Sequence, residues 1–340
     1  LNSEDDLFVH GYMSNAGYES VRQAVADSLN NRFGTSFTQK NIVMTCGAAG
    51  GLNVALKTLL NPGDEVVVIP PYFVDYGNYV RSYDGVLVTA PARPGDFQPA
   101  PEALRRAITP RTKAVIVNSP NNPTGVVYSK ESIRAMANVL LEKQREYGTS
   151  IYVISDEPYR ELVYDGVDVP FITHFYPNTI VCYSWSKSLS LPGERIGYLV
   201  IPSEADDYEL IFQAAAIATR VLGFINAPSL QQLVVARCLE EKVNVAAYDT
   251  NRRLLYEGLK KLGFESVLPQ GAFYLWVRAP GDDDKAFTEK AKAHRILVVP
   301  GSSFGWPGYV RLAYCVSKET IERSLPAFEA LARELGLINS

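Results

Sequence analysis

Residues that bind metals or form disulfides are few in this sequence. It has three histidines, His10, His174 and His294, and four cysteines, at positions 46, 182, 238 and 315. They are widely scattered, and none follows the spacing of a metal site or of a disulfide framework. We therefore predict no bound metal, and we expect a reduced, cytoplasmic protein.

Long apolar runs and clusters of like charge are absent as well. The longest apolar runs, such as Val66–Pro70 and Ile196–Ile201, are far shorter than the roughly 20 residues of a membrane-spanning helix. The formal net charge is −4, and no Lys/Arg cluster could follow a phosphate backbone. Residues 1–6 are too polar for a signal peptide, and since Leu1 is not an initiator methionine we expect residues to be missing in front of it. Neither a membrane nor a nucleic acid is a predicted partner.

The composition is that of a globular protein with a substantial core. Of the 340 residues, 47% are hydrophobic and 21% are charged, and a length of roughly 150 residues per domain suggests two domains. Between about residue 40 and residue 201, helical patterns alternate with short runs rich in Val and Ile, at 65–69, 114–118, 151–156, 180–184 and 196–201. Such runs are typical of a mostly parallel sheet covered by helices on both faces. We predict a three-layer α/β domain.

The pattern changes in the last third of the chain. After a long helical stretch around 227–262, strands are predicted at 273–277, 296–299 and 309–313, with helices at 286–294 and 318–335. These elements indicate a smaller α+β domain. We therefore predict a large α/β domain over residues 1–245 and a small one over residues 246–340.

Several polar residues follow the predicted strands, where ligands of open α/β sheets bind. Lys187 follows the run 180–184, although an isolated lysine in a Ser-rich loop is usually just solvated. Asp156 ends the run 151–156, with Tyr159 three residues later, and the alternative is an acidic helix start. Residues 118–125 are also compatible with a plain turn, and Arg195 with a surface ion pair.

The segment 47–52 joins a strand to a helix and consists mainly of small residues, which lets backbone N–H groups approach an anion. It does not read Gly-x-Gly-x-x-Gly, so a nicotinamide or flavin fold is not favoured. Pyridoxal 5'-phosphate requires three things of a protein: a lysine, a carboxylate for its ring nitrogen and several groups that bind its phosphate. The residues that follow the predicted strands offer all three. We therefore predict this cofactor.

Four motifs together resemble the class I/II aminotransferases, which have the aspartate aminotransferase-like fold type I of pyridoxal-phosphate enzymes. The resemblance extends from about Tyr12 to the C-terminus. The motifs are Asn122-Pro123-Thr124-Gly125, Asp156-x-x-Tyr159, Ser184-x-Ser186-Lys187 with Arg195, and Tyr309-Val310-Arg311-Leu312.

The resemblance implies a role for each matching residue. Lys187 would be the Schiff-base lysine and proton shuttle, Asp156 the partner of the pyridine nitrogen, and Phe73 the residue stacked on the ring. Asn122 and Tyr159 would contact the ring oxygen, with Arg311 on the substrate α-carboxylate beside Asn122. The phosphate ligands would be Ala48, Ala49, Ser184, Ser186, Arg195 and, from a second subunit, Tyr12.

The implied reaction moves an amino group from an L-amino acid to a 2-oxo acid, in a homodimer with its active site at the subunit interface. Two departures from the family are present. Ala49 stands where one aspartate-specific bacterial subgroup has a lysine, so strict dicarboxylate specificity is not expected. The family also has some tens of residues before the segment that matches Tyr12, and this N-terminal arm is expected to be missing here.

Two other functions are compatible with parts of this pattern. A lyase of the same fold, such as a C–S β-lyase or a cyclopropane-forming synthase, shares the cofactor and the removal of the Cα proton. A non-catalytic sensor domain is the third possibility, but no helix-turn-helix segment is visible. The intact set of Lys187, Asp156 and Arg311 favours an enzyme.

Overall fold

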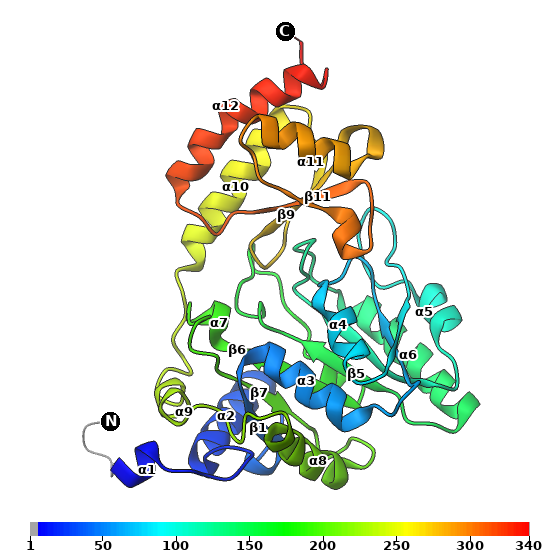
Figure 1. The fold of residues 1–340 in the computed structure, drawn as a ribbon, viewed down its shortest axis with the longest axis vertical. Coiled ribbons are helices and arrows are strands. Elements are labelled where there is room, and N and C mark those ends of the chain that lie inside the picture. The colour runs from blue at the N-terminus through cyan, green and yellow to red at the C-terminus, as the bar shows by residue number, and fades with distance from the viewer. Residues whose placement is uncertain (1–5, 340) are drawn as a thin grey trace.

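The computed structural model describes residues 6–339, which fold around two β-sheets (Figure 1). Within these residues the larger sheet has seven strands, in the order β1-β7-β6-β5-β4-β2-β3. They are β1 (Ile42–Thr45), β2 (Glu65–Val68), β3 (Val86–Thr89), β4 (Thr112–Asn118), β5 (Tyr152–Asp156), β6 (Thr179–Ser184) and β7 (Gly197–Val200). Strands β2 to β6 are parallel, whereas β7 is antiparallel to its neighbours β6 and β1.

Helices cover both faces of this sheet. Val66 and Val68 of β2 pack in the cluster that contains Leu52 of α3, and Val67 points the other way, into the cluster of Ile133 on α6. Where both faces are buried, the strands contain continuous apolar runs, whereas the edge strand β3 is more exposed. The helices of this part are α1 (Asp6–His10), α2 (Glu19–Phe33), α3 (Gly47–Leu59), α4 (Asp75–Arg81), α5 (Pro101–Ala107), α6 (Lys130–Tyr147), α7 (Trp185–Ser188), α8 (Tyr208–Val221) and α9 (Ser229–Val235). The predicted three-layer, mostly parallel α/β fold is confirmed.

The smaller sheet is antiparallel, with the order β10-β11-β9-β8. Its strands are β8 (Ser266–Val267), β9 (Tyr274–Arg278), β10 (Val299–Pro300) and β11 (Tyr309–Ala313), and the helices that belong with it are α10 (Val245–Lys261), α11 (Asp284–Ala293) and α12 (Lys318–Glu334). A separate core of buried residues, including Leu259, Phe287 and Phe328, joins these helices to the sheet. Helix α10 begins at the predicted domain boundary, and the division of the chain at residue 245 stays a prediction.

Two predicted elements differ from the structure. The helical stretch around 227–262 is not continuous, because α9 ends at Val235 and α10 begins at Val245. Between them the Val243 N–H donates to the Ser188 carbonyl oxygen at 2.9 Å, and the Asn244 side chain caps α10 by accepting from the Ala247 N–H. The predicted strand 296–299 was also wrong in extent, since β10 covers Val299–Pro300.

Within residues 6–339, no helix combines the length and the apolar character that crossing a bilayer requires.

A buried ion pair follows β5 directly. The Glu157 and Arg160 side chains are 2% and 5% exposed, and Arg160 Nε donates to Glu157 Oε2 at 2.5 Å. The Arg160 guanidinium also donates to the carbonyl oxygens of Val169 and Pro170. This pair therefore ties the loop after β5 to the segment near residue 170.

We expect Glu157→Gln to lower the free energy of unfolding by about 3 kcal/mol, because it leaves a buried guanidinium without its counter-charge. Urea unfolding would measure the change. The control is Glu329→Gln, whose exposed pair with Arg333 should be worth about 0.5 kcal/mol or less. Equal losses in the two variants would contradict the expectation.

Candidate active site

The carboxyl ends of β4, β5 and β6 open into a pocket of about 340 Å³. Asn118 and Asp156, which end β4 and β5, are paired, and Asp156 also pairs with Cys182, two residues before β6 ends. The pocket contains every predicted site residue except Tyr12. Its lining residues are Ala48, Ala49, Leu52, Phe73, Asn118, Asn122, Asp156, Pro158, Tyr159, Ser184, Ser186, Lys187, Pro192, Arg195, Tyr274 and Arg311.

Asp156 is the buried acid at the base of the pocket. Tyr76 Oη donates to its Oδ2 at 2.5 Å, whereas Oδ1 is buried and has no hydrogen-bond partner. Burial raises the pKa of Asp156 to about 7, although the Tyr76 hydrogen bond opposes the shift. A buried acceptor without a donor is costly, so Oδ1 is suited to a ligand that brings a proton or a positive charge.

Lys187 enters the pocket from α7, one turn after β6 ends. The Ser184 side chain caps this helix by accepting from the Ser186 N–H at 3.0 Å, which fixes where Lys187 emerges. Burial lowers the pKa of Lys187, and the positive charge of Arg195 lowers it further. The Nζ atom lies 5.4 Å from the centre of the Phe273 ring. A lysine with a lowered pKa has more of the neutral amine that acts as a nucleophile or a base.

Groups that suit an anion surround the N-terminus of α3. Helix α3 begins at Gly47, and its first-turn residues Ala48 and Ala49 line the pocket. Gly47 has a φ of +72°, and a Cβ there would lie 2.8 Å from Arg195 Nη2, so glycine is what leaves room for the guanidinium. The hydroxyls of Ser184 and Ser186 are 2.6 Å apart on the facing side. These donors fit a phosphate group.

Arg311 closes the pocket from β11 of the small sheet. Its Nη1 donates to Asn122 Oδ1 at 3.0 Å, and its guanidinium lies 4.4 Å and 4.9 Å from the ring centres of Tyr274 and Phe304. Its Nε is buried without a hydrogen-bond partner. The guanidinium therefore keeps donor capacity for a carboxylate.

Tyr159 lies beside Asp156 and contacts the small sheet. Its hydroxyl is 3.0 Å from the Tyr274 hydroxyl, and its ring meets Phe273 edge to face. Burial raises the pKa of Tyr159 well above its ordinary value, so the hydroxyl keeps its proton and can donate it in a hydrogen bond.

Tyr12 lies away from this pocket, and the structure leaves it 92% exposed. Conversely, sequence reasoning missed Tyr76 and Tyr274. Tyr76 follows Phe73 by three residues, a helical spacing that could have indicated a shared face. Nothing local marks Tyr274, which reaches the pocket only through the packing of the small sheet.

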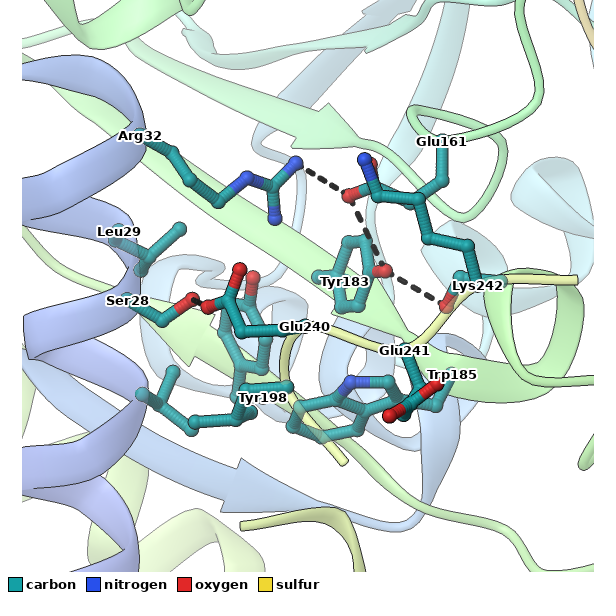
Figure 2. A pocket seen from close by; sticks show the side chains of 13 residues that line it. Ser28, Leu29, Arg32, Glu161, Tyr183, Trp185, Tyr198, Glu240, Glu241 and Lys242 are labelled. Carbon is teal, nitrogen blue, oxygen red and sulfur yellow. Dashed lines mark hydrogen bonds and ion pairs between the residues drawn. The ribbon is translucent and has the colours of Figure 1, made fainter. Parts of the chain in front are cut away.

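A second, smaller cavity of about 90 Å³ lies beside α7, and Trp185 of that helix is among its lining residues (Figure 2). Trp185 and Ser188 line it, whereas Ser186 and Lys187 line the larger pocket. Figure 2 shows the side chains of Arg32 and Glu161 joined by an ion pair. The nitrogen–oxygen distance of this pair is 2.6 Å, and the Tyr183 hydroxyl donates to the Ser188 hydroxyl at 2.8 Å. The Tyr183 hydroxyl thus lies between the Glu161 carboxylate and Ser188 of α7.

Comparisons with known proteins identify the family of this chain. The family model for aminotransferase class I and II matches residues 4–328. The aspartate/prephenate aminotransferase of Thermus thermophilus is 35% identical over 336 residues, which cover 96% of this chain and 83% of that protein. The aromatic-amino-acid aminotransferase 2 of Thermococcus litoralis is 30% identical over 339 residues, which cover 96% of this chain and 85% of that protein.

Among solved structures, an aminotransferase from Eubacterium rectale superposes with a TM-score of 0.96 at 46% identity, covering 98% of this chain and 84% of that one. The family match extends over nearly the whole chain and includes both sheets. This chain is therefore an enzyme of the aminotransferase class I and II family.

Proposed function

We propose that the pocket binds pyridoxal 5'-phosphate and that Lys187, Asp156 and Arg311 use it to move an amino group from an L-amino acid to a 2-oxo acid. The observation that carries this proposal is the unpartnered Asp156 Oδ1, buried in a pocket that also holds a half-buried lysine. The protonated pyridine nitrogen of the cofactor is a donor that fits this oxygen. When bound, the cofactor supplies an aldehyde that bonds to amines and a ring that withdraws electrons from the substrate Cα.

Asp156 would keep the ring nitrogen protonated. In a pocket where burial raises its pKa to about 7, the carboxylate is stabilised by an adjacent positive charge. Tyr76 holds the other oxygen, so Asp156 presents Oδ1 in a fixed direction. Phe73 lines the same pocket and would pack on the ring face.

Lys187 would hold the cofactor and then act as the base. Its lowered pKa favours the neutral amine, which can take the proton from the substrate Cα and return it elsewhere. Arg311 would orient the substrate by a bidentate pair with the α-carboxylate, next to Asn122. Tyr159 and Asn122 would donate to the ring oxygen.

The phosphate would be held by the backbone of Ala48 and Ala49 and by the side chains of Ser184, Ser186 and Arg195. We further propose that Tyr12 completes this set in the partner subunit of a homodimer. The support for a dimer is an exposed apolar stripe on α8. Its residues Leu210, Ile217 and Val221 are 67%, 61% and 65% exposed and recur at helical spacing. A second copy of the chain would cover them.

The lining residues include three cations, Lys187, Arg195 and Arg311, and each has a proposed role. An acidic substrate side chain would find no further cation among the pocket residues that the structure describes. We therefore propose that uncharged amino acids, aromatic ones included, are preferred over aspartate. Nothing in the comparisons favours the lyase of the same fold.

The test is an absorbance titration of the cofactor-loaded protein with single amino acids. The cofactor band should convert to that of the amino form and return when a 2-oxo acid is added, faster with phenylalanine or methionine than with aspartate. Lys187→Ala should lose the borohydride-trapped covalent bond to the cofactor and at least about a thousandfold in turnover, because both attachment and proton transfer need its amine.

One control variant and one variant of the carboxylate site complete that experiment. Lys285→Ala removes an exposed lysine on α11 and should change nothing. Arg311→Lys should keep the band and raise the KM of the amino acid, because an ammonium cannot replace the planar fork. Appreciable transamination by Lys187→Ala would refute the assignment, and release of pyruvate and ammonia without a 2-oxo acid would indicate the lyase.

Asp156 should also make the stability of the cofactor-free protein depend on pH. Its folded pKa of about 7 lies above the unfolded value of about 3.9, so the folded state binds the extra proton between these values. Stability should therefore fall as pH rises from about 4 to 7, by up to about 4 kcal/mol. Asp156→Asn should abolish this dependence of the free energy of unfolding on pH, as measured by urea unfolding at several pH values. The control Asp96→Asn, at an exposed position, should leave it unchanged.

Tyr12→Phe should raise the Kd of the cofactor about tenfold without dissociating the dimer, because it removes a hydrogen bond to a charged phosphate. Sedimentation and a cofactor titration would measure the two quantities. A fully active monomer would contradict the shared site.

A further inference from the structure

The first residue of β9, Tyr274, reaches from the small sheet into the pocket of the large one. Its side chain is buried, 8% exposed, and lines the pocket beside Tyr159 and Arg311. Tyr274 contacts both Tyr159 and Arg311, which have proposed roles in the site. It belongs to none of the four sequence motifs and has no proposed role of its own so far.

The hydroxyl of Tyr274 makes the first of the contacts that matter here. It lies 3.0 Å from the Tyr159 hydroxyl, and either oxygen could be the donor. Each tyrosine hydroxyl has a single proton. If Tyr159 donates its own proton to a ring oxygen of the cofactor, it must accept the proton of Tyr274. That accepted bond makes Tyr159 a stronger donor.

The ring makes the second, in addition to its edge-to-face contacts with Tyr159 and Phe273. The Arg311 guanidinium lies 4.4 Å from the Tyr274 ring centre, which is within the range of a cation–π interaction. The two residues come from paired strands, since Tyr274 of β9 is opposite Ala313 of β11. The guanidinium therefore lies against the Tyr274 ring, with Phe304 at 4.9 Å, while its Nη1 donates to Asn122.

We propose that Tyr274 is a positioning residue that couples the two halves of the site, holding the Tyr159 hydroxyl with its own hydroxyl and the Arg311 guanidinium with its ring. This inference rests on the proposed function. It assigns the electronic tuning of the cofactor and the binding of the substrate carboxylate to one side chain of the small sheet.

Two substitutions separate the two contacts. Tyr274→Phe keeps the ring and removes the hydroxyl, whereas Tyr274→Leu removes both. In Tyr274→Phe the pH midpoint of the cofactor absorbance titration should rise by about half a unit, because the anionic ring oxygen loses part of its stabilisation. The KM of the amino acid should stay unchanged. Tyr274→Leu should show the same shift and, in addition, a KM about threefold to fivefold higher.

A double variant tests whether the effect passes through Tyr159. Tyr159→Phe should shift the midpoint by itself, and Tyr159→Phe/Tyr274→Phe should shift it no further. Additive shifts would overturn the proposed path. The matched control is Tyr314→Phe, which removes a buried hydroxyl from the same core, bonded to the Ala272 carbonyl oxygen at 3.2 Å, and should leave the midpoint and the KM as they are.

The outcomes distinguish this inference from the proposed function. If the wild-type protein shows no titrating cofactor band, the proposed function fails. If the wild-type band titrates normally and Tyr274→Phe leaves its midpoint unchanged, the positioning role alone is wrong. Circular dichroism of each variant confirms that it is folded, and a folded Tyr274→Leu with an unchanged KM would remove the contact to Arg311 from the proposal.

Discussion

The site depends on a carboxylate that is only half satisfied. Asp156 lies at the end of the central strand β5, with one oxygen bonded to Tyr76 and the other buried without a donor. Such a group is unfavourable in a closed core, where water cannot reach it. At a strand end the pocket lies beside it, and a ligand that brings positive charge would offset the cost of its burial.

The parallel sheet brings the other groups to the same edge. Asn118, Asp156 and Ser184 end β4, β5 and β6, and the next residues along the chain include Asn122, Tyr159 and Lys187. Antiparallel β7 returns the chain so that Arg195, just before it, lies next to Gly47 at the start of α3. The small sheet then adds Arg311 and Tyr274 from β11 and β9. The residues around Asp156 and Lys187 are thus positioned by the large sheet. Arg311 and Tyr274 are positioned by the packing of the small sheet against it.

This division explains what the sequence could predict. The α/β fold and the polar strand ends could be predicted because continuous Val and Ile runs and the residues that follow them are local features. The break between α9 and α10 has a local signal in the Asn244 cap, but the hydrogen bond from Val243 that holds it joins the distant Ser188. Tyr76 and Tyr274 were missed because their partners Asp156 and Tyr159 are 80 and 115 residues away. Tyr12 could be singled out only by resemblance, and within one chain it remains exposed.

The hydrogen bond between Val243 and Ser188 has a mechanical consequence. It pins the end of the connecting segment to α7, the same short helix that carries Lys187, immediately before α10 leads into the small sheet. The backbone that carries Lys187 and the backbone from which the small-sheet helices start therefore share one hydrogen bond. The amine of Lys187 and the guanidinium of Arg311, which come from different sheets, are thus referred to a common anchor point in the fold.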